Sequence, residues 1–379
     1  METLEHHGRR LRLRRFPLRE DDPLRAWDAA DTYLLRHLDA EDPAQPGRLL
    51  LVNDGFGALA AALHPHHPVF WSDSEMSRRA LQINLESNDL DPAAVLFVPA
   101  SEDPAGPFDT VLLKLPKSLV YLEDLLCRLR PLLHADSVVL LGGMIKHTPA
   151  RAYRLLEEIL GPTRTTLGWK KARLAVSRFQ ERATEPNPPE AAIIELPADE
   201  LTLASGPNVF SRERLDHGTR MLLEHLPRKE EPCAVLDLGC GNGVLALAAA
   251  RRNPAAWVKG LDESHQAIAS ARQNASALGW GETRATFAVA ADLSDEQSAR
   301  YDLIVSNPPF HQGVVVGDQL AWGMLHQARR LLKPGGRLLV VGNRHLGYHV
   351  KLQRLYDTVR VVASDRRFVV LEAVTDPGE

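Results

Sequence analysis

The residues of this sequence that could do chemistry gather in one short stretch, 301–310. Residues 303–305 form an apolar run that predicts a short buried strand. Two consecutive prolines, Pro308–Pro309, cannot donate backbone hydrogen bonds to a sheet, so the strand must end before them. The stretch therefore predicts a stiff strand tip with an amide, Asn307, on one side of the prolines and an aromatic ring, Phe310, on the other.

A tip of this kind suits the alkylation of a planar exocyclic amine. The side-chain oxygen of Asn307 and a backbone carbonyl, expected to be that of Pro308, can accept both N–H bonds of an NH2 group. The lone pair of the amine is then held along one line, and orientation is most of what a direct displacement needs. Phe310 can stack on the ring that carries the amine, which contributes about 1–3 kcal/mol per base in single-strand binders. Taken alone, the stretch could equally be a Pro-Pro turn with a capping Asn.

Upstream, a glycine-rich turn separates a predicted strand, 235–238, from a predicted helix, 244–250. Gly239, Gly241 and Gly243 allow the backbone to approach a ligand closely, and they open a helix whose N–H groups face it. The spacing is G-x-G-x-G, which differs from the G-x-G-x-x-G of dinucleotide sites. The turn is therefore predicted to bind a ligand of another kind.

Acidic residues follow the next two predicted strands. Asp262 comes directly after the predicted strand 257–261, nineteen residues beyond Gly243. An acid at this place can accept hydrogen bonds from ribose hydroxyls. Asp292 follows the predicted strand 285–290 and can reach an adenine edge. A nucleoside-bearing ligand is therefore expected beside the glycine turn.

In this order, the glycine turn, the two acids and the Asn-Pro-Pro-aromatic tip resemble class I S-adenosylmethionine-dependent methyltransferases. The resemblance implies S-adenosylmethionine as the cofactor and Asn307, Pro308, Pro309 and Phe310 as the catalytic residues. It also implies that a helix within 208–227, with Ser211 as its expected N-cap, roofs the cofactor. The cofactor-binding residues that the resemblance and the spacing indicate are Asp237, Gly239, Gly241, Asn242, Gly243, Asp262, Asp292, Phe210 and Thr219.

The first half of the chain repeats the second. Residues 49–63 read as the same strand, glycine turn and small-residue helix. Residues 108–117 align in sequence with residues 301–310. There Lys114 replaces Asn307, and Lys117 replaces the aromatic ring. Ammonium groups only donate hydrogen bonds, so this half should be inactive, with lysines that either meet phosphates or are solvated. The predicted fold class is α/β, a tandem of two Rossmann-like class I methyltransferase domains of which the first is degenerate.

The length of 379 residues is enough for two or three domains that each bury a core. The stretch 181–190 is rich in Pro and Glu and has almost no apolar residues, as a linker does. We predict a degenerate methyltransferase-like domain at 1–183, a linker at 184–192 and a catalytic domain at 193–379. The first domain would bind RNA or act as a scaffold.

Composition limits the partners. A net charge of −4 argues against a generally basic nucleic-acid surface, so RNA would meet local patches. Two candidates are Arg9–Arg15, which could be only an exposed edge, and Lys170–Arg173. The sequence has no long apolar run and no signal-peptide pattern, which predicts a cytoplasmic protein without a membrane span. The three cysteines show no paired spacing and the histidines at 64–67 are interrupted by proline, so no metal is expected.

Nearly the whole chain resembles the ribosomal RNA guanine-N2 methyltransferases. Eight segments carry the resemblance: Arg15–Pro17, Ala26–Asp31, Asn53–Gly57, Thr165–Leu174, Asn208–Ser211, Asp237–Gly243, Asn307–His311 and Asn343–Leu346. It implies guanine N2 of 23S ribosomal RNA as the target, in free RNA or in a large-subunit assembly particle, and activity in the second domain only. Protein-glutamine N5 and nucleic-acid adenine-N6 methylation use a similar tip and stay open, as does a non-catalytic RNA-binding assembly factor.

Overall fold

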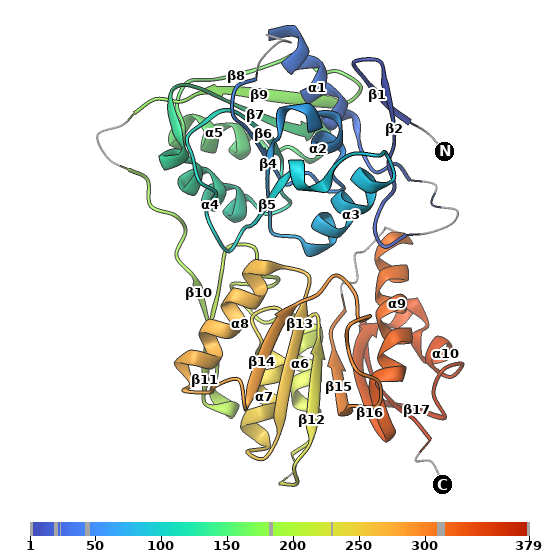
Figure 1. Cartoon of the computed structure of the whole chain (residues 1–379). Helices are drawn as coiled ribbons and strands as arrows, with labels where there is room; N and C mark the ends of the chain where they lie inside the picture. The colour runs from blue at the N-terminus through green and yellow to red at the C-terminus, as the bar shows by residue number, and fades with distance from the viewer. Residues whose placement is uncertain are drawn as a thin grey trace. The chain divides into compact units, whose positions relative to one another are not determined.

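The computed structural model describes residues 3–18, 22, 24–41, 46–181, 185–228, 230–308 and 315–376. The chain divides into two compact units, Met1–Glu190 and Ala191–Glu379, called unit 1 and unit 2 below. The predicted linker, 184–192, spans this division, and its limits stay a prediction. Each unit contains one seven-stranded sheet with helices packed on it, as Figure 1 shows.

The helices and strands of each unit follow one another in the α/β order that the sequence predicts. In unit 1 they are β1 Thr3–His6, β2 Arg9–Arg12, α1 Ala29–Glu41, β3 Leu49–Val52, α2 Ala58–Ala62, β4 Val69–Ser72, α3 Glu75–Glu86, β5 Leu96–Pro99, β6 Phe108–Lys114, α4 Leu119–Leu129, β7 Leu133–Met144, α5 Ala150–Ile159, β8 Thr163–Thr165 and β9 Ala172–Arg178. In unit 2 they are β10 Ala192–Leu196, β11 Leu201–Ser205, α6 His217–Glu224, β12 Ala234–Leu238, α7 Val244–Arg252, β13 Trp257–Asp262, α8 His265–Ala277, β14 Ala285–Val289, β15 Tyr301–Ser306, α9 Val315–Leu331, β16 Leu332–Asn343, α10 Tyr348–Leu352, β17 Thr358–Ser364 and β18 Phe368–Val374.

The two seven-stranded sheets have the same topology. Their strand orders are β5-β4-β3-β6-β7-β9-β8 and β14-β13-β12-β15-β16-β18-β17. In each sheet the first five strands are parallel, and the last two join antiparallel. This order confirms the predicted tandem of two Rossmann-like methyltransferase domains.

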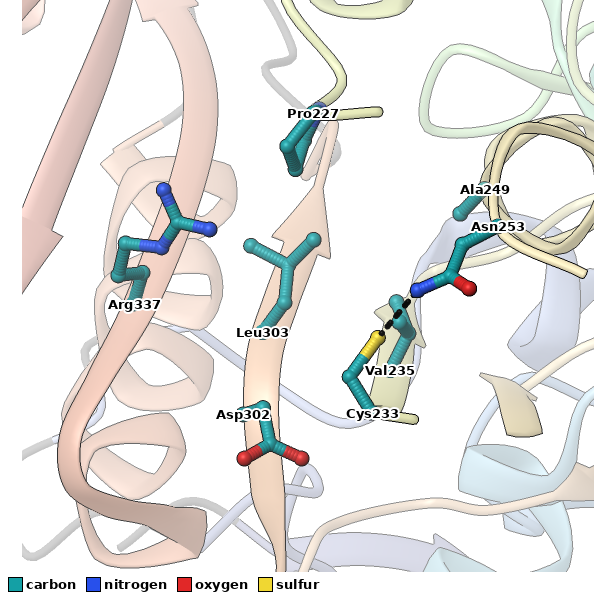
Figure 2. Close-up of a pocket in the computed structure, with 8 residues that line it drawn as sticks. All are labelled: Pro227, Cys233, Val235, Ala249, Asn253, Asp302, Leu303 and Arg337. Atoms are coloured by element: carbon teal, nitrogen blue, oxygen red, sulfur yellow. Dashed lines mark hydrogen bonds between the residues drawn. The ribbon is translucent and has the colours of Figure 1, made fainter. Parts of the chain in front are cut away.

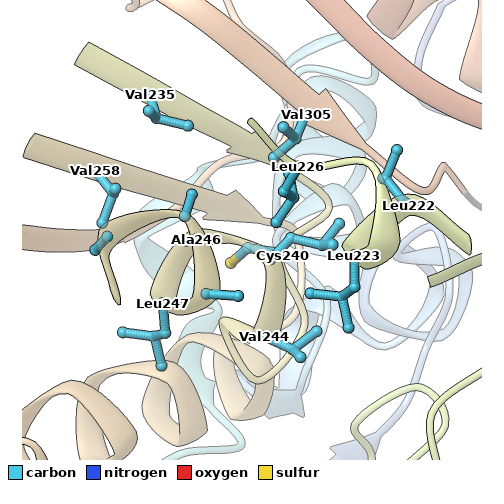
Figure 3. Close-up of a cluster of buried hydrophobic side chains, with 14 of the residues drawn as sticks. Leu222, Leu223, Leu226, Val235, Cys240, Val244, Ala246, Leu247, Val258 and Val305 are labelled. Carbon is cyan, nitrogen blue, oxygen red and sulfur yellow. The ribbon is translucent and has the colours of Figure 1, made fainter. Parts of the chain in front are cut away.

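Helices cover both faces of the sheet in unit 2, so its central strands are apolar on both sides. Val235 and Val305 face a cluster formed with α6, α7 and α8, whereas Leu236 and Ile304 face α9 and α10. Figure 3 shows the first cluster, in which three leucines of α6 and the turn after it lie near Val305. This packing places α6 in the same apolar cluster as β15, the strand that ends just before Asn307.

The repeat extends to the hairpins that precede each sheet, which the sequence reading did not predict. In unit 2, Asn274 on α8 bonds the N–H and the C=O of Ala204, at the end of β11, at 2.8 and 2.9 Å. In unit 1, Asn84 on α3 bonds the same two backbone groups of Arg14, just after β2, at 2.8 Å each. The hairpins β1–β2 and β10–β11 are therefore counterparts, each tied to the third helix of its unit by one amide.

The start predicted for the roofing helix is wrong. The helix α6 begins at His217, and its cap is Asp216, whose side chain accepts a hydrogen bond from the N–H of Thr219 at 3.0 Å. Ser211 lies instead in a turn with a left-handed φ of 52°. The reason is a tertiary contact: the N–H of Asn208 donates to a side chain on α8 at 3.0 Å, which holds this segment along α8 before the helix can begin.

Candidate functional site

The glycine turn and the Asn-Pro-Pro tip lie side by side in unit 2. The strands β12 and β15 are parallel neighbours, and Leu238 pairs with Ser306 at their carboxyl ends. The hydroxyl of Ser306 also donates to the carbonyl of Leu238 at 2.8 Å. Gly239 and Asn307 are the next residues on the two strands. Strand order reverses between β12 and β15, and open α/β sheets bind their ligands at such a switch point.

The glycines of the turn differ in what surrounds them: two border open space and one lies in close packing. Gly239 and Gly241 have left-handed φ values of 74° and 55°, and a Cβ on Gly239 would meet nothing within 4 Å. At Gly241 the nearest atom to such a Cβ is a methyl of Val209, 4.0 Å away. A Cβ on Gly243 would instead approach the ring of Phe287 to 3.1 Å. The first two therefore leave open space beside the backbone for a ligand, and the third permits close packing.

Asp237 lies buried beneath the turn with one oxygen unused. Its Oδ2 accepts a hydrogen bond from the N–H of Ala246 at 3.0 Å, whereas Oδ1 has no partner among the described residues. Burial raises the pKa of Asp237 to about 7, and the nearby carboxyl of Asp262 adds to the shift. A buried acceptor without a partner is uncommon. It fits a ligand that brings positive charge or a hydrogen-bond donor to this turn.

Asp262 is held with both oxygens directed by backbone groups. Its Oδ2 accepts from the N–H of Gly241 at 2.9 Å, and its Oδ1 accepts from the N–H of Ser264 at 3.0 Å. Burial raises its pKa. Each oxygen can accept a second bond, and the predicted contact with ribose hydroxyls stays a prediction. Asp292 is exposed three residues after β14 and accepts from the N–H of Ser294 at 2.8 Å, and its contact with adenine stays a prediction.

Three other predicted cofactor contacts differ in what they can offer. The side chain of Asn242 is buried and donates to the hydroxyl of Ser205 on β11 at 2.8 Å, so only its backbone could reach a ligand. Phe210 is 72% exposed and follows Val209, which lies over the glycine turn. Its contact with the cofactor stays a prediction. Thr219 is buried, and its hydroxyl is bound to Asn307.

The amide of Asn307 is fixed by two hydrogen bonds that the sequence reading missed. Its Nδ2 donates to Oδ2 of Asp216 at 2.8 Å and to Oγ1 of Thr219 at 2.8 Å. Both amide protons are then engaged, and Oδ1 is the side-chain atom left to accept a bond from a substrate. Pro308 is buried at the end of the strand, whereas Pro309 and Phe310 lie outside the described residues.

The corresponding tip of unit 1 is closed by an ion-pair cluster. The ammonium group of Lys114 lies 2.8 Å from Oδ1 of Asp28 and 2.7 Å from Oδ1 of Asp31, and its side chain is only 15% exposed. Burial raises the pKa of Asp31. Lys114 is therefore neither solvated nor directed at phosphate, and both predicted alternatives are wrong for it. Lys117 is exposed, and Asn53 adopts the left-handed conformation that Gly239 has in unit 2.

The small cavity in Figure 2 does not belong to this site. Cys233, Val235, Asp302 and Arg337 are among the residues that line it, at the amino ends of β12 and β15. The carboxyl ends of the same strands carry the glycine turn and Asn307. The cavity is therefore a packing gap at the opposite edge of the sheet.

One group of side chains in the described ranges has donor atoms close enough for a metal: those of His6, His7 and Asp39 lie within 4.8 Å of one another. A hydrogen bond of 2.9 Å between His7 and Asp39 accounts for part of this grouping, and it lies in unit 1. His64, in the interrupted histidine stretch, shares a hydrogen bond with a backbone carbonyl at 2.9 Å. No helix of the described ranges is long and apolar enough to cross a bilayer.

Comparisons with known proteins agree with this geometry. Residues 1–181 match the family model of the RLMG N-terminal domain, and residues 200–372 match that of the methyltransferase small domain. The chain is 48% identical over 364 residues to the ribosomal RNA large subunit methyltransferase G of Pseudomonas paraeruginosa, covering 96% of this chain and 97% of that one. It is also 48% identical over 365 residues to that of Pseudomonas putida, with the same coverage.

Among solved structures, the chain is similar to a T. thermophilus 16S rRNA N2 methyltransferase, RsmC, in complex with AdoMet and guanosine. The TM-score is 0.73 at 24% identity, and the match covers 98% of this chain and 97% of that one. At this identity the likeness shows the tandem fold. The sequence relatives and the family models show that the chain belongs to the ribosomal RNA large subunit methyltransferase G family.

Proposed function

We propose that the chain transfers the methyl group of S-adenosylmethionine to the N2 amine of a guanine in 23S ribosomal RNA, either free or within a large-subunit assembly particle. The observation that carries the proposal is the amide of Asn307, whose two N–H groups are engaged by Asp216 and Thr219 and whose oxygen is left for an amine. Family membership supports ribosomal RNA as the target. The reaction takes place in the cytoplasm, together with its ribosomal substrate.

Asn307 and Pro308 align the amine that is methylated. The oxygen of Asn307 and the carbonyl of Pro308 accept the two N–H bonds of guanine N2, so the nitrogen lone pair has one direction. As the new N–C bond forms and the C–S bond breaks, positive charge grows on N2, and these oxygens stabilise it. The surplus proton then leaves to water. The guanine must leave its stack to reach the tip, which costs a few kcal/mol, and stacking on Phe310 offsets part of that cost.

The glycine turn and its acids hold the methyl donor. S-adenosylmethionine, when bound, supplies an electrophilic methyl group on a sulfonium sulfur. Gly239 and Gly241 leave the space that it needs, and Asp262 accepts bonds from its ribose hydroxyls. The buried carboxyl of Asp237, which has one oxygen without a partner among the described residues, attracts the positive charge of the ligand electrostatically. Phe210 covers the bound cofactor from the segment before α6.

Affinity for S-adenosylmethionine should rise about tenfold between about pH 6 and pH 8, because Asp237 titrates in this range. Burial raises the pKa of its carboxyl to about 7, so the protonated form dominates at the lower pH and the ionised form at the higher. A cationic ligand favours the ionised form, so binding releases a proton and strengthens with pH. Calorimetric titrations in buffers of different ionisation enthalpy measure both the affinity and the proton count.

Asp237→Asn is the matched control, since it keeps the shape of the side chain and removes its titration. The amino group of the ligand titrates equally in both proteins, so the comparison isolates Asp237. The variant should bind more weakly at the higher pH and release less proton. A wild-type profile as flat as that of the variant would show that Asp237 does not ionise on binding.

Unit 1 acts in this proposal as an RNA-binding platform, through a basic hairpin tip. Trp169 and Ala172 exchange backbone hydrogen bonds of 2.9 and 2.8 Å, so Lys170 and Lys171 form a two-residue turn. Both lysines have left-handed φ values, 44° and 67°, which usually call for Asn or Gly. Both are exposed, and the ammonium of Lys170 and the guanidinium of Arg36 lie 4.7 and 5.5 Å from the centre of the Trp169 ring. A ring among cations suits single-stranded RNA.

Reversing both charges, Lys170→Glu with Lys171→Glu, should weaken RNA binding about tenfold and lower the salt dependence by about two released counterions. Fluorescence anisotropy with a 23S fragment at several salt concentrations measures both quantities. Arg79→Glu with Arg154→Glu, two exposed charge reversals on α3 and α5, serves as the control for net charge. An equal loss in both proteins would mean that the hairpin makes no direct contact.

Methyl transfer from labelled S-adenosylmethionine tests the function. The acceptors are naked 23S RNA, assembled large subunits, DNA and protein, and mass spectrometry locates the methyl group. We expect label on guanine N2 of 23S RNA. Label on adenine N6 or on a protein glutamine would replace the proposed substrate. Failure of the chain to bind S-adenosylmethionine in a calorimeter would point to a non-catalytic assembly factor.

A further inference from the structure

We propose that Asp216 and Thr219 are positioning residues for methyl transfer: they orient and polarise the amide of Asn307 from the first turn of α6. The inference rests on the proposed function, because it concerns the residues that hold the Asn307 amide, whose oxygen is proposed to bind the guanine amine. Oδ2 of Asp216 and Oγ1 of Thr219 each lie 2.8 Å from Nδ2 of Asn307. Neither residue needs to touch the guanine to have this effect.

The orientation of the amide follows from the chemistry of its partners. A carboxylate can only accept hydrogen bonds, so the atom of Asn307 that faces Asp216 must be the nitrogen. The hydroxyl of Thr219 accepts the other amide proton, and it lies 3.4 Å from Oδ2 of Asp216, to which it can donate. An inverted amide would set its oxygen against a carboxylate oxygen. The pair therefore prevents the flip that would offer the amine two N–H donors in place of an acceptor.

The same contact makes the Asn307 oxygen a better acceptor. Hydrogen bonds in a chain polarise one another, and a charged member strengthens the effect. The negative charge of Asp216 draws on the amide N–H, so electron density on Oδ1 increases. Positive charge grows on the guanine N2 during methyl transfer, so the benefit is larger in the transition state than in the bound substrate.

The fold keeps these residues in place. Asp216 is the N-cap of α6, and Thr219 is buried in its first turn. Leu222, Leu223 and Leu226, which follow on the same segment, pack into the apolar cluster shown in Figure 3 together with Val305 of β15. The helix that supplies the two acceptors is thus anchored in the same apolar cluster as the strand that carries Asn307.

Three substitutions measure the contributions of Thr219 and Asp216 to the methylation rate separately. Thr219→Val removes the hydroxyl at nearly constant volume and should lower the single-turnover methylation rate about tenfold, and Thr219→Ser should restore most of it. Asp216→Ser keeps an N-cap side chain but removes the carboxylate, and a loss of about tenfold or more is expected. The affinity for S-adenosylmethionine, measured by calorimetry, should change by less than about twofold in each case.

A double-mutant cycle provides a readout that a purely structural role would not change. In an Asn307→Ala background the amide is absent, so adding Asp216→Ser or Thr219→Val should reduce the rate little further. If the two residues served only to hold α6, their losses would add to that of Asn307→Ala. Additive losses, or full activity of Thr219→Val, overturn the inference.

The controls keep this test separate from that of the function. Ser118→Ala removes the N-cap of α4 in unit 1, where Oγ accepts from the N–H of Tyr121 at 3.2 Å, so it should lower the melting temperature and leave the methylation rate unchanged. If the wild-type chain methylates an amine other than guanine N2, the proposed function fails, and the cycle is run on that amine. If guanine N2 is methylated and the losses add, only the positioning role fails.

Discussion

Asn307→Ala should lower the methylation rate by about 100- to 1,000-fold, the loss seen when a group that stabilises a transition state is removed from other enzymes. The substitution deletes the oxygen that we propose accepts an N–H bond of guanine N2. It also leaves Asp216 and Thr219 without the amide that engages them now. Rate constants from single-turnover reactions with saturating S-adenosylmethionine and 23S RNA report the chemical step directly.

The affinity of Asn307→Ala for S-adenosylmethionine should stay near that of the wild type. Gly239 and Asp262, two of the residues assigned to the cofactor, lie after β12 and at the end of β13, and their own contacts do not involve the amide. Asn88→Ala, which removes amide contacts to Arg12 in unit 1, is the matched control and should methylate normally. A normal rate for Asn307→Ala would show that another group holds the amine.

The sequence predicted the parts of the site that lie close together along the chain. An apolar run stopped by Pro308–Pro309 has to be a strand that ends there, and β15 ends at Ser306. Alternate glycines have to form an open turn, and both Gly239 and Gly241 adopt left-handed conformations. These conclusions needed only local rules for proline and glycine together with the alternation of strands and helices.

The contacts missed from the sequence join residues that are far apart in it. Asp216 and Asn307 are 91 positions apart, and Lys114 and Asp28 are 86 apart. No periodicity relates such pairs, so nothing in the sequence joins either acid to its partner. The pattern Asp-x-x-Thr at 216–219 indicates a helix N-cap. It does not indicate that the capping carboxylate also accepts a hydrogen bond from Asn307.

The repeat of the hairpins was missed for a related reason. Arg14 and Ala204 occupy equivalent places, and their bonds to Asn84 and Asn274 use only their backbone groups. Their side chains can therefore differ completely, as they do. An asparagine that binds backbone in this way leaves the bound residue free to vary. Sequence similarity between the two hairpins therefore could not reveal the shared structure.

In both units a carboxylate accepts a hydrogen bond from the helix after the turn, but the carboxylate comes from a different place in the chain. In unit 2 the N–H of Ala246, in the helix after the glycine turn, donates to Asp237 on the strand. In unit 1 the N–H of Ala60 donates at 2.9 Å to Asp54, which comes from the turn itself and is buried. That carboxyl, whose pKa burial raises to about 7, stands in the turn where unit 2 keeps its glycine backbone. The acid therefore brings a buried charge that needs a cation.

Replacing that cation by Lys114→Met should destabilise unit 1 by about 3 kcal/mol, because removing one partner from a buried ion pair leaves the other uncompensated. The carboxyl of Asp31 lies 2.7 Å from the Lys114 ammonium, and Asp54 lies within its electrostatic reach. Met keeps the length of the side chain, so packing changes little. Thermal unfolding should begin about 6–12 °C earlier, on the scale for domains of this size.

The destabilisation should depend on pH in a defined direction. Burial raises the folded-state pKa values of Asp31 and Asp54, so the folded state resists their ionisation. The resulting penalty is absent below the unfolded pKa of about 4 and grows as the pH rises toward the folded value. Lys114→Met should therefore be nearly as stable as the wild type under acid conditions and least stable, relative to the wild type, above about pH 7.

Lys117→Met, which replaces an exposed lysine three residues along, is the matched control and should change stability little at any pH. If both variants behave alike, Lys114 does not neutralise the cluster. A loss confined to Lys114→Met would show that the degenerate unit keeps its lysine for folding.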